Sequence, residues 1–210
     1  MLPLSFHSLL IRNNIRYTSN LLSKCRKITP FNIPNPLGIQ SHRNIAFQPP
    51  NSSPPPHEMV YFPEMTTNPP ASSGEFRRVL FTGLYSQVVL MTIPVGGDMG
   101  DEVHLVDQAL TFTSGVGLAT INGKDQVVKE GDMMVVPAGT QNQFVNTGDI
   151  PLVLYKIYSP AEHAPITVHH TKEEGNKEAE EVKFRAVGWS RRTKGKNEKA
   201  GLVKLSGKYE

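Results

Sequence analysis

The amino-acid sequence predicts an all-β fold for the region between Phe76 and Pro160. Short runs rich in β-branched and apolar residues recur there about every 8–12 residues, which is the spacing of a β-sandwich or barrel. Asn122-Gly123 separates two of these runs and is a strong hairpin signal, because both positions of a type I′ turn need a positive φ. The region shows no helical periodicity of useful length. The predicted strands are 79–81, 87–93, 109–113, 118–121, 126–128, 133–136, 143–145 and 152–158.

The composition fits one domain with extensions. The chain has 210 residues, 38% of them hydrophobic, with 17 glycines and 17 prolines, which suits a turn-rich β domain. Eight prolines between Pro49 and Pro70 predict a stiff linker over residues 49–75, because proline fixes φ and lacks a backbone donor. We therefore expect a barrel over residues 76–160, packed structure only after the linker, and disordered extensions at both ends.

The N-terminal stretch has an unusual charge pattern. No Asp or Glu precedes Glu58, whereas six Lys or Arg residues and several serines do. Such a pattern is typical of a transit peptide, so we expect a mitochondrial presequence over residues 1–48 and a matrix location after its cleavage. The alternative is a tail without a targeting role. The single cysteine, Cys25, excludes an intrachain disulfide, and no apolar run approaches the roughly 20 residues that cross a bilayer.

Two glycine-framed motifs carry the candidate functional residues. In the first motif, Glu102 and His104 lie one residue apart between Gly96 and Gly115, and Gln108 follows them. Residues two apart in a strand face the same side, so an extended segment would point Glu102 and His104 together into the barrel. The second motif runs over 131–146 and contains a Pro-Ala-Gly-Thr turn followed by Asn142.

The two motifs together resemble those of the cupin superfamily, and especially small single-domain type-2 cupins with an RmlC-like jelly roll. This resemblance implies a double-stranded β-helix barrel whose four ligand positions are occupied here by Glu102, His104, Gln108 and Asn142. Metal-binding cupins usually supply two or three histidines and a carboxylate, whereas this chain retains one histidine.

The altered donor set leaves two interpretations of the cofactor. A divalent metal such as Mn, Fe, Zn or Ni is the candidate, with Asn142 as the weakest ligand because an amide oxygen binds these metals less well than imidazole. In the alternative, no metal is bound. A buried Glu102 then needs a protonated His104 as its partner, or takes up a proton itself.

The expected function is the binding of a small polar ligand in a barrel pocket lined by Phe112, Phe144 and Tyr155, through a weak divalent-metal site. The resemblance also offers an enzyme alternative, a metal-assisted activity like that of sugar-phosphate isomerases. For that chemistry His104 is the candidate base and Tyr155 or Glu102 the candidate acid, since imidazole titrates near neutrality. The pattern assigns no catalytic residue beyond these alternatives.

The C-terminal stretch, residues 161–210, is predicted to be a charged tail. Residues 172–181 suit a short solvated helix, and His163, His169 and His170 are expected on a surface loop. Basic residues from Lys183 to Lys208 also suggest a nucleic acid or an anionic membrane surface as an alternative partner. A homodimer is expected through strands 79–81 or 152–158, as sheet edges with unpaired backbone groups.

Overall fold

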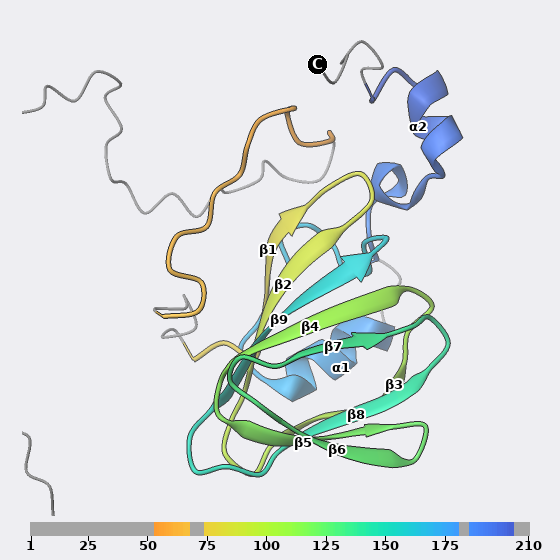
Figure 1. The fold of residues 1–210 in the computed structure, drawn as a ribbon. Helices are drawn as coiled ribbons and strands as arrows, with labels where there is room; N and C mark the ends of the chain where they lie inside the picture. Colours follow the sequence, from red (N-terminus) through yellow and green to blue (C-terminus); the bar gives the residue numbers. More distant parts are fainter. Residues whose placement is uncertain (1–52, 68–73, 181–184, 204–210) are drawn as a thin grey trace, which may run out of the picture. The chain divides into compact units, whose positions relative to one another are not determined.

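The structure is a computed structural model that describes residues 53–67, 74–180 and 185–203. The described residues form ten strands in two antiparallel sheets that face each other (Figure 1). The six-stranded sheet has the order β10-β1-β2-β9-β4-β7, and the four-stranded sheet the order β3-β8-β5-β6. The strands are β1 (Arg77–Thr82), β2 (Gln87–Ile93), β3 (Asp98–Val103), β4 (Asp107–Ser114), β5 (Val116–Ile121), β6 (Lys124–Lys129), β7 (Met133–Val136), β8 (Gln141–Asn146), β9 (Leu152–Ser159) and β10 (Val168–His169).

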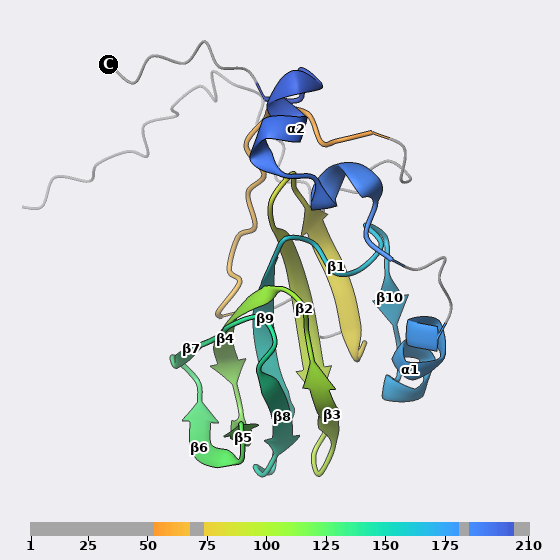
Figure 2. The ribbon, with the colours of Figure 1, turned by 90° about the vertical axis from the view of Figure 1, so that its right-hand side faces the viewer.

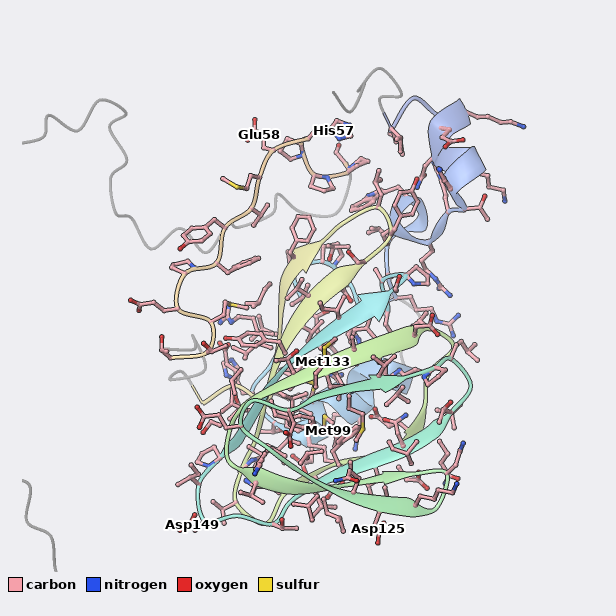
Figure 3. The ribbon with its side chains drawn as sticks, viewed as in Figure 1. His57, Glu58, Met99, Asp125, Met133 and Asp149 are labelled. Carbon is pink, nitrogen blue, oxygen red and sulfur yellow. The ribbon has the colours of Figure 1, made fainter. Side chains whose placement is uncertain are left out.

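The main core lies between the two sheets. Phe112 of β4 and Phe144 of β8 meet there with ring centroids 6.1 Å apart, and Met99 of β3 lies between the sheets (Figure 3). A smaller cluster of Leu80, Leu90, Val153 and Tyr155 covers the opposite face of the six-stranded sheet. Because side chains alternate along a strand, neighbouring residues of β9 contribute to different clusters.

The predicted strands are confirmed, each within two residues at either end. The predicted Asn122-Gly123 hairpin is also confirmed, since both residues have a positive φ and join β5 to β6. Strands β3 and β10 were not among the predicted strands. Neither has the run of β-branched and apolar residues that identifies a strand in the sequence. The sequence of Asp98–Val103 is DMGDEV, and this segment is a strand because it pairs with β8.

The prediction of a disordered C-terminal tail is wrong for the residues that the structure describes there. Beyond β10, the chain forms α1 (Lys172–Glu180), η3 (Gly188–Arg191) and α2 (Lys194–Lys199), and Figure 2 shows β10 beside β1 with α1 next to it. The predicted short helix at 172–181 is confirmed. The tail is ordered because β10 pairs with β1 and because Trp189 is buried, with 8% of its surface exposed.

The predicted linker is partly packed. Phe62 and Met65 lie against the outer cluster of Leu80, Leu90, Val153 and Tyr155, so packing begins before residue 70 rather than after it. The predicted presequence over residues 1–48 lies outside the described residues. Within the described ranges, no helix has the length and apolar character needed to cross a membrane.

The strands expected at the sheet edges lie inside the sheet instead. Strand β1 is paired on both sides, with β10 and β2, and β9 lies between β2 and β4. Strand β10 pairs with β1 only at Arg77 and Arg78, so the expected dimer through residues 79–81 stays a prediction, whereas β9 has a strand on both sides. The edges in the described part of the chain are β10, β7, β3 and β6.

Asn146 joins the end of β2 to the turn between β8 and β9. Its Nδ2 donates to the carbonyl oxygens of Ile93, at 3.0 Å, and Ile150, at 2.9 Å, while its Oδ1 accepts from the backbone N–H of Gly148 at 3.0 Å. The residue is buried, so water cannot replace these partners.

We predict that Asn146→Ala lowers the free energy of unfolding by about 3 kcal/mol, because three backbone groups lose their partner. Urea denaturation followed by circular dichroism measures the change. Thr147→Ala, at the exposed neighbouring position, is the control and should stay within about 0.5 kcal/mol of the parent. Equal losses in the two variants would contradict the assigned role of Asn146.

Candidate functional site

A cavity of about 350 Å³ lies between the edge of β3 and the strands β1 and β10, and we call it the seam cavity. Its wall residues come from β1, β3, β10 and α1, and from the segments that follow β3, β9 and α1. The wall includes Arg77, Met99, Glu102, His104, Glu162, His163, Thr167, His169, Gly175, Asn176 and Glu178.

Two ion pairs hold α1 at the seam cavity. Lys172 Nζ lies 2.5 Å from Asp98 Oδ1 of β3, and His169 of β10 pairs with Glu178. The hydrogen bond from Lys172 lowers the pKa of Asp98, against a smaller opposing effect of burial. The helix is therefore attached to an edge strand of each sheet and closes one side of the cavity.

Glu102 and His104 form a hydrogen-bonded pair in the cavity wall, as the spacing predicted. Glu102 Oε2 lies 2.9 Å from His104 Nε2, and His104 Nδ1 lies 3.9 Å from Glu162 Oε1. Burial alone lowers the pKa of His104, but the two carboxylates outweigh burial and raise it. Burial alone raises the pKa of Glu102, but its bond to His104 and the charges of Lys156 and Arg77 leave it lowered. Between pH 4.5 and 6.5 the pair is therefore an imidazolium beside a carboxylate.

The other two predicted ligand positions lie deeper. Asn142 is the cross-strand partner of Glu102, and its Nδ2 donates to the carbonyl oxygens of Glu102 and Thr140, both at 3.0 Å. Gln108 is only 1% exposed, and its Oε1 has no hydrogen-bond partner in the described part of the chain. The amide of Asn142 is committed to the backbone, whereas that of Gln108 keeps an unused acceptor.

Lys156, a fully buried lysine on the inward face of β9, was not among the predicted site residues. Its Nζ lies 3.3 Å from Tyr158 Oη and stands 5.9 Å from the Phe144 ring centre and 5.4 Å from that of Tyr158. Burial lowers its pKa to about 8, although the charge of Glu102 opposes that effect. The signal was present in the sequence, since Lys156 falls in phase with Leu152, Leu154 and Tyr158, which are core residues.

The four predicted ligand positions do not fit a resident metal as they stand. Glu102 and His104 are bonded to each other, and Asn142 and Gln108 could offer only amide oxygens. The Lys156 ammonium already supplies positive charge near Glu102, which disfavours a second cation. Among the described residues, no three His, Cys, Asp or Glu side chains gather as a metal site. A divalent ion would have to displace the existing bonds of Glu102 and His104 in order to bind there.

Of the predicted pocket residues, Phe112 and Phe144 lie in the hydrophobic core of the barrel and do not line the seam cavity, and Tyr155 lies outside the barrel interior. Tyr155 faces the opposite side of the six-stranded sheet and packs with Leu80, Leu90 and Val153. Residue 155 is out of phase with the inward residues of β9, so the prediction that Tyr155 lines the pocket or acts as an acid there is wrong. Burial raises its pKa to about 12.

The histidines predicted on a surface loop divide into two groups. His170 is exposed, as expected, whereas His169 is buried in β10 and His163 contacts the Tyr158 ring edge-on at 5.2 Å. Burial holds the pKa of His163 well below its usual value, so its ring is neutral near pH 7. The surface prediction is wrong for His163 and His169 because β10 and the segment before it fold back onto the barrel.

The fold and its two glycine-framed motifs define a cupin barrel, and comparison with known proteins agrees. Residues 89–158 match the family model described as a cupin domain. The chain is also 36% identical to the Bacillus halodurans protein BH2720, whose crystal structure it matches with a TM-score of 0.52 over 61% of this chain and 98% of that one. The chain belongs to the cupin family.

Two curated relatives share this part of the sequence. The chain is 42% identical over 107 residues to uncharacterized protein YrkC of Bacillus subtilis (strain 168), covering 48% of this chain and 58% of YrkC. It is 38% identical over 96 residues to uncharacterized protein L612 of Acanthamoeba polyphaga mimivirus, covering 43% of this chain and 59% of L612. The chain thus spans less than two thirds of either relative.

The Glu102–His104 pair predicts a defined pH dependence of stability for His104→Gln. The raised pKa of His104 stabilises the fold below pH 6.5 and loses its effect as the pH rises through that raised value. The lowered pKa of Glu102 stabilises the fold above pH 4.5 and loses its effect as the pH falls through that lowered value.

The stability difference between the parent and His104→Gln should therefore be greatest between pH 4.5 and 6.5 and shrink on both sides. We expect a maximum of about 1.5–3 kcal/mol, the range for hydrogen bonds to charged groups. Urea denaturation at a series of pH values measures it. A difference that does not change with pH would contradict the charged pair.

Proposed function

We propose that this cupin binds a small polar molecule in the seam cavity. The observation that carries the proposal is a group of wall residues with unused hydrogen-bonding atoms. Arg77 Nε, His163 Nε2, Thr167 Oγ1 and His169 Nδ1 are buried and have no hydrogen-bond partner among the described residues. Buried polar groups are normally paired, so their gathering at one cavity favours a polar ligand that completes them.

We further propose that binding needs no divalent metal. In the family's metal sites, the cation charge comes from the bound ion, whereas here the Lys156 ammonium lies inside the same barrel. Its charge favours the ionised form of Glu102, and the hydrogen bond to Glu102 raises the pKa of His104 against the opposing effect of the lysine charge. The lysine thus does electrostatically what a metal would otherwise do, and the ligand meets the His104–Glu102 pair directly.

Proton transfer on the bound molecule is the second candidate function. His104 lines the cavity between the carboxylates of Glu102 and Glu162, so one ring can hold a proton and release it to either side. This arrangement supports the acid and base roles suggested by the sequence for His104 and Glu102, without Tyr155. The two candidate functions are distinguished by one result. An enzyme releases the bound molecule chemically changed, whereas a binding protein releases it unchanged.

Expectations about location and larger partners stay predictions. They comprise the mitochondrial matrix, the homodimer, and binding of nucleic acid or an anionic membrane through Lys183–Lys208. Two basic residues of that stretch, Arg185 and Arg191, line the seam cavity. This placement supports a role in the cavity for these two positively charged residues of the basic stretch.

Blocking the seam cavity should abolish small-molecule binding. Asn176 is an exposed residue of α1 that lines the cavity, and Lys177 is its exposed neighbour outside the lining. Small polar metabolites that raise the thermal unfolding midpoint of the parent chain should lose that effect in Asn176→Trp and keep it in Lys177→Trp. Retention of all the shifts in Asn176→Trp would place binding elsewhere and overturn the proposal.

Metal analysis tests the second part of the proposal. The purified chain, treated with chelator and then exposed separately to Mn²⁺, Fe²⁺, Zn²⁺ and Ni²⁺, should hold well below one ion per chain after desalting. Lys156→Met combined with Asn142→His is the comparison variant and should gain metal, since it removes a cation and adds an imidazole. One ion per parent chain, lost in Glu102→Gln, would contradict metal independence.

A further inference from the structure

We infer that the ligand of the seam cavity carries one anionic group, a carboxylate or a phosphate, and that Arg77 binds it. This inference rests on the proposed function and adds the chemical class of the ligand. The geometry that carries it is a buried arginine without a carboxylate partner, facing a cavity whose own carboxylates are already engaged.

Arg77 is the first residue of β1 and is 7% exposed. No carboxylate pairs with it in the part of the chain that the structure describes, its Nε has no hydrogen-bond partner, and its guanidinium carbon lies 5.8 Å from the Phe76 ring centre. A guanidinium taken out of water without a partner is costly. An anion that enters the cavity would remove that cost and could be held by two parallel N–H bonds.

The acidic residues of the cavity wall pair with histidines and not with Arg77. Glu178 is paired with His169, Glu102 with His104, and Glu162 lies 3.9 Å from the other nitrogen of His104. The pairing therefore separates the cavity into an acceptor-rich end around His104 and a donor-rich end around Arg77. A ligand with a single anionic group fits this division, because a second one would meet Glu102 and Glu162.

Gly175 keeps the donor-rich end open. It lies inside α1, where glycine is unfavourable relative to alanine, so a positional reason is expected. A Cβ added at this position would lie 3.2 Å from His169 Nδ1 and 3.5 Å from Arg77 Nη1. The missing side chain thus leaves space beside His169 and beside Arg77, the group that we assign to the anion.

The inference is tested with inorganic phosphate and glycolate as separate probes, at ionic strength matched with NaCl, and with glycerol as a neutral probe. The readout is the thermal unfolding midpoint as a function of probe concentration, from which an apparent dissociation constant follows. The variants are Arg77→Gln and Gly175→Ala. Gly195→Ala is the matched control, since Gly195 also lies in a helix but a Cβ there meets no described atom within 4 Å.

We expect at least one anion to stabilise the parent and Gly195→Ala equally. The apparent dissociation constant should rise about tenfold or more in both Arg77→Gln and Gly175→Ala, through loss of charged hydrogen bonds and of space respectively. Comparison of phosphate with glycolate then tells which anionic group the site prefers. If Arg77→Gln does not fold, Gly175→Ala still tests the inference, because alanine favours the helix and this variant is expected to fold.

An anion response that is unchanged in Arg77→Gln, or absent from the parent, would overturn the inference. If glycerol stabilises the parent and loses that effect in Asn176→Trp while neither anion acts, the cavity still binds a polar molecule and only the anionic class is wrong. If none of the probes acts and the metabolite shifts also survive Asn176→Trp, the proposed function fails as well.

Discussion

The ammonium group of Lys156 inside the barrel is the constraint on which the polar part of this structure depends. A fully buried cation needs negative charge and electron-rich surfaces around it, and β9 places it beside the Tyr158 hydroxyl and the rings of Phe144 and Tyr158. Glu102 supplies the opposing charge from the facing sheet. The ionised Glu102 then fixes the protonated His104 at the cavity wall. The lysine therefore favours the ionised form of Glu102 and opposes the proton on His104, which the hydrogen bonds to Glu102 and Glu162 hold in place.

The barrel could be predicted because its strands have local signals. Strands β2 and β9 are continuous runs of apolar and β-branched residues, and Asn122-Gly123 fixes one hairpin through backbone conformation alone. Strand β3 carries little such signal, and its place follows from pairing with β8 about 40 residues later in the chain. The motif spacing nevertheless located Glu102 and His104 correctly, because two-residue spacing fixes a shared face wherever the chain is extended.

The remainder of the site could not be predicted for a physical reason. Arg77, His163 and His169 become cavity residues only when β10 pairs with β1, which brings together residues more than 80 positions apart. A two-residue strand has no recognisable pattern, and the polar helix α1 touches the barrel mainly through Gly175 and two ion pairs. Lys156 is the exception, since its inward direction follows from its phase with the apolar residues of β9.

The closure of the seam cavity by the last described segments also links ligand occupancy to the integrity of the chain. The wall extends from Phe76 to Arg191, so the cavity is complete only once the residues up to Arg191 have folded, whereas every described strand except β10 ends by Ser159. A chain that was cut after β10 and had lost the residues beyond the cut would keep its paired sheets but lack the wall residues of α1 together with Arg185 and Arg191. The ligand that we propose for this cavity would thus distinguish intact chains from clipped ones that retain their barrel.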